Sequence, residues 1–141
     1  MIRIAKECDL DDIIKIERDC FARPYSGELI LQDLRGDKVK TFVYAENETI
    51  VGFISVYVFL DEANLQQIAV ESKHRNKGIA SALLQYVINY LKHQPVVKFY
   101  LEVNENNLIA IKTYEKFGFK KVVTRKNYYG NQNALVYELM L

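Results

Sequence analysis

The chain of 141 residues has the length of one domain, and 50% of its residues are hydrophobic, so we expect a single packed globule. Its 19 basic and 18 acidic residues leave a formal charge of +1, which gives no bulk reason to expect nucleic-acid binding. No apolar run approaches the roughly 20 residues that cross a bilayer, and the first residues lack the pattern of a secretory signal, so we expect a cytoplasmic protein. Cys8 and Cys20 are too few and too isolated for a disulfide framework or a metal site.

In the first half of the chain, the spacing of apolar residues predicts a strand, two helices and two strands joined as a hairpin. We expect these elements, in that order, over residues 2–6, 9–21, 26–34, 41–46 and 50–60. Asp9 has the side chain of a helix N-cap, and the segment Arg23-Pro24-Tyr25 separates the two helices because proline interrupts helical hydrogen bonding. Residues 47–49 form the expected hairpin turn.

In the second half, strands and helices alternate. We expect a strand, a helix, a strand, a helix and two final strands over residues 65–70, 79–91, 97–103, 107–117, 120–128 and 133–140. Gly118 is the expected C-terminal cap of the second of these helices. Strand–helix–strand units imply parallel neighbours and hairpins imply antiparallel ones, so the sequence predicts the α+β class, with a mixed sheet covered by helices.

The turn from Arg75 to Ala80 is the most informative local pattern. It is basic, contains Gly78 and leads from an expected strand into the N-terminus of an expected helix. Unpaired N–H groups and the positive end of the helix dipole meet there, which favours an anionic phosphate or pyrophosphate. The glycine spacing matches neither the dinucleotide fingerprint nor the nucleotide P-loop, so an ordinary helix start is the alternative.

Two further segments strengthen the interpretation of this turn. Leu101-Glu102-Val103-Asn104 ends an expected strand, and the segment 107–119 contains the pattern Tyr-x-x-x-Gly-Phe. Together with Arg-x-x-Gly-x-Ala in the turn, these segments resemble the signature of the GNAT family of acetyl-CoA-dependent N-acetyltransferases, and the order of elements matches that fold over essentially the whole chain. The resemblance implies a central mixed seven-stranded sheet flanked by about four helices.

The segment 61–70 and the pair Tyr128-Tyr129 resemble most the RimI-like branch of the family. That branch acetylates protein N-termini, and its named target is a small-subunit ribosomal protein. The resemblance therefore implies acetyl-CoA as co-substrate, no metal, and a protein or peptide N-terminus as acceptor.

By the same resemblance, three regions would bind the coenzyme. The turn would hold its pyrophosphate through backbone N–H groups of Arg75, Asn76, Lys77, Gly78, Ile79, Ala80 and Ser81. The strand residues Ile68, Ala69 and Val70 would line the pantetheine arm and the acetyl group, and Asn107 would contact the arm. Ala80 departs from the family pattern, where glycine is common at this position, but it still lets a phosphate approach closely.

The reaction needs a neutral amine, because an ammonium cannot attack a thioester. At neutral pH roughly one α-amine in ten is neutral, since its pKa is about 8, whereas lysine has a pKa of about 10.4. Modest help from a carboxylate acting through water would suffice for an α-amine, and the resemblance assigns this role to Glu102. The alternative is an ordinary glutamate on the polar face of its strand, paired with Lys98.

Tyr114 is the candidate general acid that protonates the departing thiolate, by its place in the Tyr-x-x-x-Gly-Phe pattern. The alternative is a core aromatic residue, because Tyr114 lies three positions from apolar residues of its own helix. Tyr25, Tyr128 and Tyr129 fall on loops that flank the acceptor channel in related enzymes, and they could equally cover the sheet. Relatives often carry tryptophan where Tyr25 stands.

We therefore expect transfer of acetyl from acetyl-CoA to a protein N-terminus. One alternative keeps the enzyme but changes the acceptor to a small amine or a lysine side chain. Another is an acyl-CoA-binding sensor without catalysis, and the presence of both Glu102 and Tyr114 argues against it.

Overall fold

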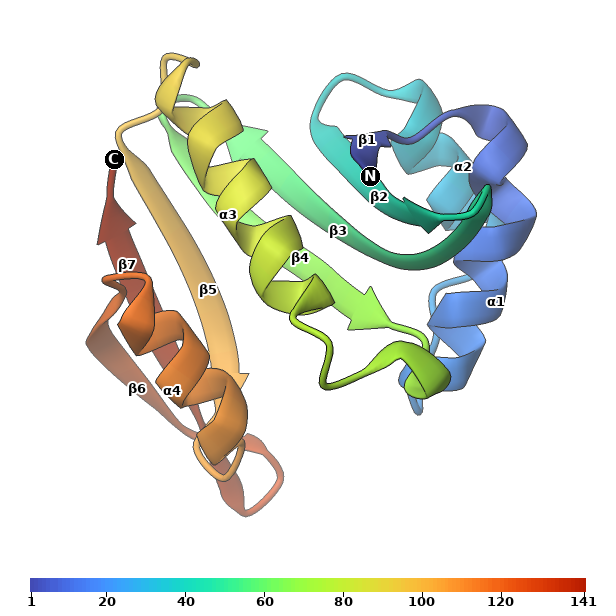
Figure 1. Cartoon of the computed structure of the whole chain (residues 1–141). Helices are drawn as coiled ribbons and strands as arrows, with labels where there is room; N and C mark the ends of the chain where they lie inside the picture. The colour runs from blue at the N-terminus through green and yellow to red at the C-terminus, as the bar shows by residue number, and fades with distance from the viewer.

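The computed structural model describes residues 1–141 and has one seven-stranded sheet at its centre (Figure 1). The strands are, in chain order, β1 (Ile2–Ile4), β2 (Val39–Glu46), β3 (Thr49–Phe59), β4 (Glu62–Val70), β5 (Lys98–Asn104), β6 (Lys120–Tyr129) and β7 (Gln132–Met140). In space they follow the order β1-β2-β3-β4-β5-β7-β6. All neighbours are antiparallel except β4 and β5, which the crossover through α3 joins as a parallel pair.

The helices cover both faces of this sheet. They are α1 (Leu10–Cys20), α2 (Gly27–Arg35), α3 (Ile79–Lys92) and α4 (Leu108–Lys116), with short 3₁₀ turns η1 (Glu7–Asp9) and η2 (Ser72–His74). In Figure 1, α3 and α4 lie in front of the sheet, and α1 and α2 lie together against its N-terminal strands. The predicted class, order of elements, seven strands and four helices are confirmed.

Two separate apolar cores reflect these two layers. The larger contains 18 buried residues, to which α3 contributes a continuous stripe, and α4 contributes Tyr114. The smaller contains seven buried residues, which join α1 and α2 to the other face of β2, β3 and β4. Alternate residues of β4 therefore point to different cores: Val70 to the larger and Ala69 to the smaller.

The strands β4 and β5 pair over only three residues each, from Glu62 with Lys98 to Asn64 with Tyr100. Beyond this point they diverge, as Figure 1 shows. A register shift in β3–β4 leaves Gln66 as an extra residue, and such a bulge bends its strand away from the regular ladder. The sheet therefore opens in its middle, at the C-terminal ends of its two parallel strands.

The predicted capping role of Asp9 is wrong. Asp9 precedes α1, but its carboxylate accepts no N–H of that helix. Instead it receives two hydrogen bonds from the Arg3 guanidinium, at 2.8 and 2.9 Å, and one from the Lys6 N–H at 2.7 Å. These bonds, those of Arg3 first, hold the pKa of Asp9 below its usual value, and they tie β1 to the start of α1.

The expected end of α4 at Gly118 is confirmed, since this glycine has φ of 97° immediately after the helix. Other bounds differ from expectation by a few residues; β4, for example, begins at Glu62 rather than Leu65. No helix is both long enough and apolar enough to cross a membrane.

Burial in the larger core predicts a measurable contribution to stability. Leu83 is 0% exposed on α3, so Leu83→Ala should lower the free energy of unfolding by about 3 kcal/mol, through lost transfer energy and a residual cavity. Leu60 is 80% exposed, and the same change there should cost less than about 0.5 kcal/mol. Urea denaturation followed by circular dichroism measures both, and equal losses would contradict the assignment of the core.

Candidate active site

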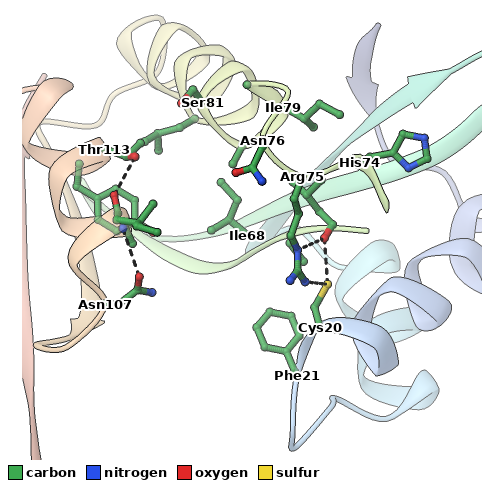
Figure 2. Close-up of a pocket in the computed structure, with 18 residues that line it drawn as sticks. Cys20, Phe21, Ile68, His74, Arg75, Asn76, Ile79, Ser81, Asn107 and Thr113 are labelled. Atoms are coloured by element: carbon green, nitrogen blue, oxygen red, sulfur yellow. Dashed lines mark hydrogen bonds between the residues drawn. The ribbon is translucent and has the colours of Figure 1, made fainter. Parts of the chain in front are cut away.

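A cleft of about 490 Å³ lies where β4 and β5 diverge. It is lined from four elements: the end of α1, the C-terminal half of β4, the turn into α3, and α4. Figure 2 shows Asn107 and Thr113 on one side, Cys20, Phe21 and Arg75 on the other, and Ile68 between them. Eleven of the residues predicted for the site line it: Ile68, Ala69, Val70, Arg75, Asn76, Gly78, Ile79, Ala80, Ser81, Asn107 and Tyr114.

The glycine turn opens into this cleft. Gly78 has φ of 79° and stands at the N-cap of α3 without any side-chain cap, so the first N–H groups of the helix are left for a ligand. The first turn of α3 carries no acidic residue, which leaves the positive end of the helix dipole uncompensated. Lys77, also predicted for this site, is exposed and does not line the cleft.

Arg75 joins this turn to the end of α1. Its Nε donates to the carbonyl oxygen of Val70 at 3.1 Å, and its Nη2 lies 3.3 Å from Sγ of Cys20 (Figure 2). Cys20 Sγ also lies 3.3 Å from the same Val70 oxygen. The guanidinium thus fixes the relative position of β4, the turn and α1 at one end of the cleft.

Tyr114 reaches the cleft from α4. Its ring is buried and packs against Phe119, with a centroid distance of 6.0 Å. Burial raises the pKa of its hydroxyl above the usual value, because the phenolate would lose hydration. The hydroxyl therefore remains protonated, and able to donate, throughout the neutral range.

Asn107 caps α4, because its Oδ1 accepts the N–H of Ala110 at 3.3 Å. This leaves its side-chain nitrogen to face the cleft.

Glu102 does not line the cleft. Its neighbours Leu101 and Val103 are buried in the larger core, so alternation along β5 places Glu102 on the opposite face of the sheet, the face covered by α1 and α2. Its Oε1 lies 2.9 Å from Nη1 of Arg125, with the Glu102 side chain 32% exposed. The pairing with Lys98 that the alternative interpretation of Glu102 offered is not found, because Lys98 Nζ lies 3.9 Å from Oε2 of Glu138 instead.

Tyr128 and Tyr129 lie beside this ion pair. The Arg125 guanidinium carbon is 5.7 Å from the centroid of the Tyr128 ring, and the two tyrosine rings are 5.2 Å apart. The pKa of Tyr129 is raised, first by burial and then by the charge of Glu102. Glu102 and the tyrosine pair are therefore brought together, on a different face of the sheet from Tyr114.

Tyr25 lies apart from both groups. It packs against the smaller core and lines a small polar cavity between α1, α2 and the sheet. Its backbone N–H donates to Oε1 of Glu17 at 2.8 Å. Burial, followed by the charges of Glu17 and Asp33, raises the pKa of its hydroxyl.

The sequence interpretation missed several residues that line the cleft. Ile109, Ala110 and Thr113 are on α4, and helical spacing from Asn107 and Tyr114 could have identified them. Cys20 and Phe21 carry no such signal, because only the docking of α1 against the sheet brings them to β4.

Comparison with known proteins agrees with this geometry. Residues 10–119 match the model of the acetyltransferase (GNAT) family. The chain is 33% identical to a [ribosomal protein bS18]-alanine N-acetyltransferase of Haemophilus ducreyi, in an alignment 146 positions long that covers 100% of both chains. It is 32% identical to an N-alpha-acetyltransferase of Saccharolobus solfataricus, over 92% of this chain and 86% of the relative.

A solved structure is also similar over nearly its whole length. The crystal structure of the ribosomal-protein-S18-alanine N-acetyltransferase from Escherichia coli superposes with a TM-score of 0.92 and 30% identity, over 99% of this chain and 92% of that one. With a family match across most of its length and relatives that align from end to end, this chain belongs to the acetyltransferase (GNAT) family.

Proposed function

We propose that this protein transfers the acetyl group of acetyl-CoA to the N-terminal α-amine of a small-subunit ribosomal protein in the cytoplasm. As a member of the GNAT family, the protein is an acetyl-CoA-dependent N-acetyltransferase. We propose in addition which acceptor it uses and which residues bind the substrates and transfer protons. The divergence of β4 from β5 carries the proposal, because it leaves an opening between the face that bears Tyr114 and the face that bears Glu102. The relatives that acetylate the N-terminal alanine of bS18 support the choice of acceptor.

The coenzyme occupies the cleft in this proposal. Its pyrophosphate binds the N–H groups at the start of α3, where the helix dipole favours an anion. Its pantetheine arm lies along the edge of β4 that has no pairing partner beyond Asn64. An extended ligand can bond such an edge as an added strand would, so residues 68–70 hold the arm and direct the thioester into the opening.

The acceptor amine approaches from the other face of the sheet. Glu102, acting through a water molecule, removes a proton from the amine as it attacks the thioester carbonyl. An α-amine needs little such help at neutral pH, because its pKa of about 8 leaves a substantial neutral fraction. Tyr25, Tyr128 and Tyr129 border this side and hold the backbone of the acceptor.

Collapse of the tetrahedral intermediate releases the coenzyme thiolate. Tyr114 donates its phenolic proton to that sulfur, which its raised pKa allows because the hydroxyl remains protonated at working pH. The oxyanion that precedes this step needs N–H donors, and the unpaired edge of β4 near Val70 supplies them.

The choice of acceptor can be tested with three peptides: one with a free N-terminal alanine, the same peptide with a blocked N-terminus, and a blocked peptide with an internal lysine. We expect acetyl-CoA-dependent turnover of the first to exceed that of the others at least about tenfold at pH 7, because of the different amine pKa values. Mass spectrometry of the products measures this. Equal turnover of the blocked lysine peptide would contradict the proposal, and acetyl-CoA binding with no turnover at all would indicate a sensor.

The role of Tyr114 predicts a split between rate and affinity. Tyr114→Phe should lower kcat about 100-fold, because the leaving thiolate loses its acid, while the Kd of acetyl-CoA changes less than about twofold. Tyr137→Phe is the matched control, since Tyr137 is buried but does not line the cleft, and it should leave kcat unchanged. Steady-state kinetics measure kcat, and calorimetric titration measures the Kd of acetyl-CoA. A normal kcat in Tyr114→Phe would show that Tyr114 is a core aromatic residue and not the general acid.

The role of the glycine turn predicts a loss of coenzyme affinity. Gly78 and Gly130 have φ of 79° and 75°, and at both an added Cβ meets open space, so alanine strains the backbone similarly at each, by about 1 kcal/mol. Only Gly78→Ala should weaken coenzyme A binding, about tenfold, because strain there displaces the N–H groups that face the pyrophosphate. Isothermal titration calorimetry measures the affinity of each variant for coenzyme A. Equal affinities of Gly78→Ala and Gly130→Ala would count against binding of the pyrophosphate at the glycine turn.

A further inference from the structure

Glu17 on α1 is a charged residue with 0% exposure. A carboxylate that leaves water must regain hydrogen bonds inside the protein, or its burial is costly. One oxygen does so: Oε1 accepts the N–H of Tyr25 at 2.8 Å and Nε2 of Gln67 at 2.7 Å. The other, Oε2, is buried without a partner. None of the proposed steps uses this group, so its placement needs another explanation.

The two partners of Glu17 belong to two segments that adjoin the cleft, the α1–α2 connection and β4. Tyr25 lies in the connection between α1 and α2, whose first residue, Phe21, lines the cleft. Gln67 precedes Ile68, which lines the cleft from β4. The backbone carbonyl of Glu17 also accepts the Phe21 N–H, at 3.1 Å. Glu17 therefore makes two hydrogen bonds to the α1–α2 connection, to Phe21 and Tyr25, and one to β4, to Gln67.

These contacts lie on the face of the sheet from which the acceptor approaches. Ala69 is buried in the smaller core beneath α1 and α2, and alternation along β4 gives Gln67 the same face. Glu102 projects from β5 on that face as well. Glu17 therefore acts on the acceptor side, and its contacts are separate from the glycine turn.

The carboxylate also sets the orientation of the Gln67 amide. Because Oε1 of Glu17 accepts the hydrogen bond from Nε2 of Gln67, the amide nitrogen of Gln67 faces Glu17. The carbonyl oxygen is then the end that remains to accept a hydrogen bond from an N–H of the acceptor.

A polar cavity adjoins the group. It has a volume of about 10 Å³, of the order of one water molecule, and Asp33, Ser55 and Gln66 contribute to its walls. Gln66 Nε2 donates to Asp33 at 3.0 Å, so α2 is bound to the same stretch of β4. The helices α1 and α2 are thus both attached to β4 by polar contacts at the bulge, and the position of the α1–α2 connection depends on them.

We infer that Glu17 is a positioning residue for the acceptor. By holding Tyr25 and Gln67 on one oxygen, it fixes the α1–α2 connection against β4, beside the opening that the acceptor enters. This inference rests on the proposed function. A residue that served only the stability of the core would affect both substrates alike.

The kinetic test compares Glu17→Ala, Glu17→Gln and Gln67→Ala, with Asp12→Asn as the control that removes a charge from an exposed position on the same helix. We expect Glu17→Ala to raise the KM of an N-terminal alanine peptide about tenfold and that of acetyl-CoA less than about twofold, because hydrogen bonds to a charged group are lost on the acceptor side alone. Gln67→Ala should raise only the acceptor KM, by about threefold, since one of the two contacts remains. Glu17→Gln should stay near wild type, because its carbonyl oxygen can accept both bonds.

Hydrogen exchange gives a readout that does not depend on turnover. The Tyr25 amide should exchange faster in Glu17→Ala than in wild type, but not in Gln67→Ala or Asp12→Asn. If Glu17→Ala does not fold, the acceptor KM of Gln67→Ala decides.

The inference is overturned if the acceptor KM of Gln67→Ala matches that of Asp12→Asn, or if both substrates lose affinity in parallel. It also fails if the Tyr25 amide of a folded Glu17→Ala exchanges at the wild-type rate. Failure of the proposed function looks different: the wild-type protein would not acetylate the peptide. In that case the exchange rate of the Tyr25 amide would still be measured in each variant, together with the KM of the amine that the enzyme does acetylate. These two measurements would still test the role of Glu17 as a positioning residue.

Discussion

The site depends on how briefly β4 and β5 pair. A parallel pair that continued to the ends of both strands would use every backbone group on the facing edges and close the sheet. Here pairing stops at Asn64 and Tyr100, and the bulge at Gln66 bends β4 further away. The unpaired backbone groups are polar and need partners. In the proposed function the extended arm of the coenzyme provides them, so the interruption of the sheet is also the proposed binding site.

Where β4 and β5 diverge, the predicted site residues lie on both faces of the sheet. The glycine turn, Asn107 and Tyr114 all belong to α3 and α4 or to the turn that precedes them, and they share one cleft. Glu102 projects to the other face, next to Arg125 and the tyrosine pair. Donor and acceptor can therefore meet in the opening without competing for the same surface. Arg75 and Glu17 each connect α1 to β4, one at the donor side and one at the acceptor side.

The parts of the structure that local chemistry determines could be predicted from the sequence. Gly78 and Tyr114 were predicted from short patterns that resemble the GNAT signature, Arg-x-x-Gly-x-Ala and Tyr-x-x-x-Gly-Phe, and both line the cleft. The partner of Glu102 was not, because Arg125 comes from β6, which is separated from β5 in the sheet by β7. Asp9 was misread for a different reason: a carboxylate suited to capping also makes a good partner for an arginine, and Arg3 on β1 lies only six residues before it. Glu17 has no sequence signal, since a glutamate on an amphipathic helix is usually solvated.

The two cores differ in size, and this difference has a consequence for motion. Eighteen buried residues attach α3 and α4 to the sheet, whereas seven attach α1 and α2. Because the free energy that opposes local opening grows with the apolar surface it exposes, the α1–α2 layer is the cooperative unit that opens at the lower cost. Local opening thus falls mainly on the layer that contains Glu17 and Tyr25, whereas the layer that carries Tyr114 and the start of α3 resists it more strongly.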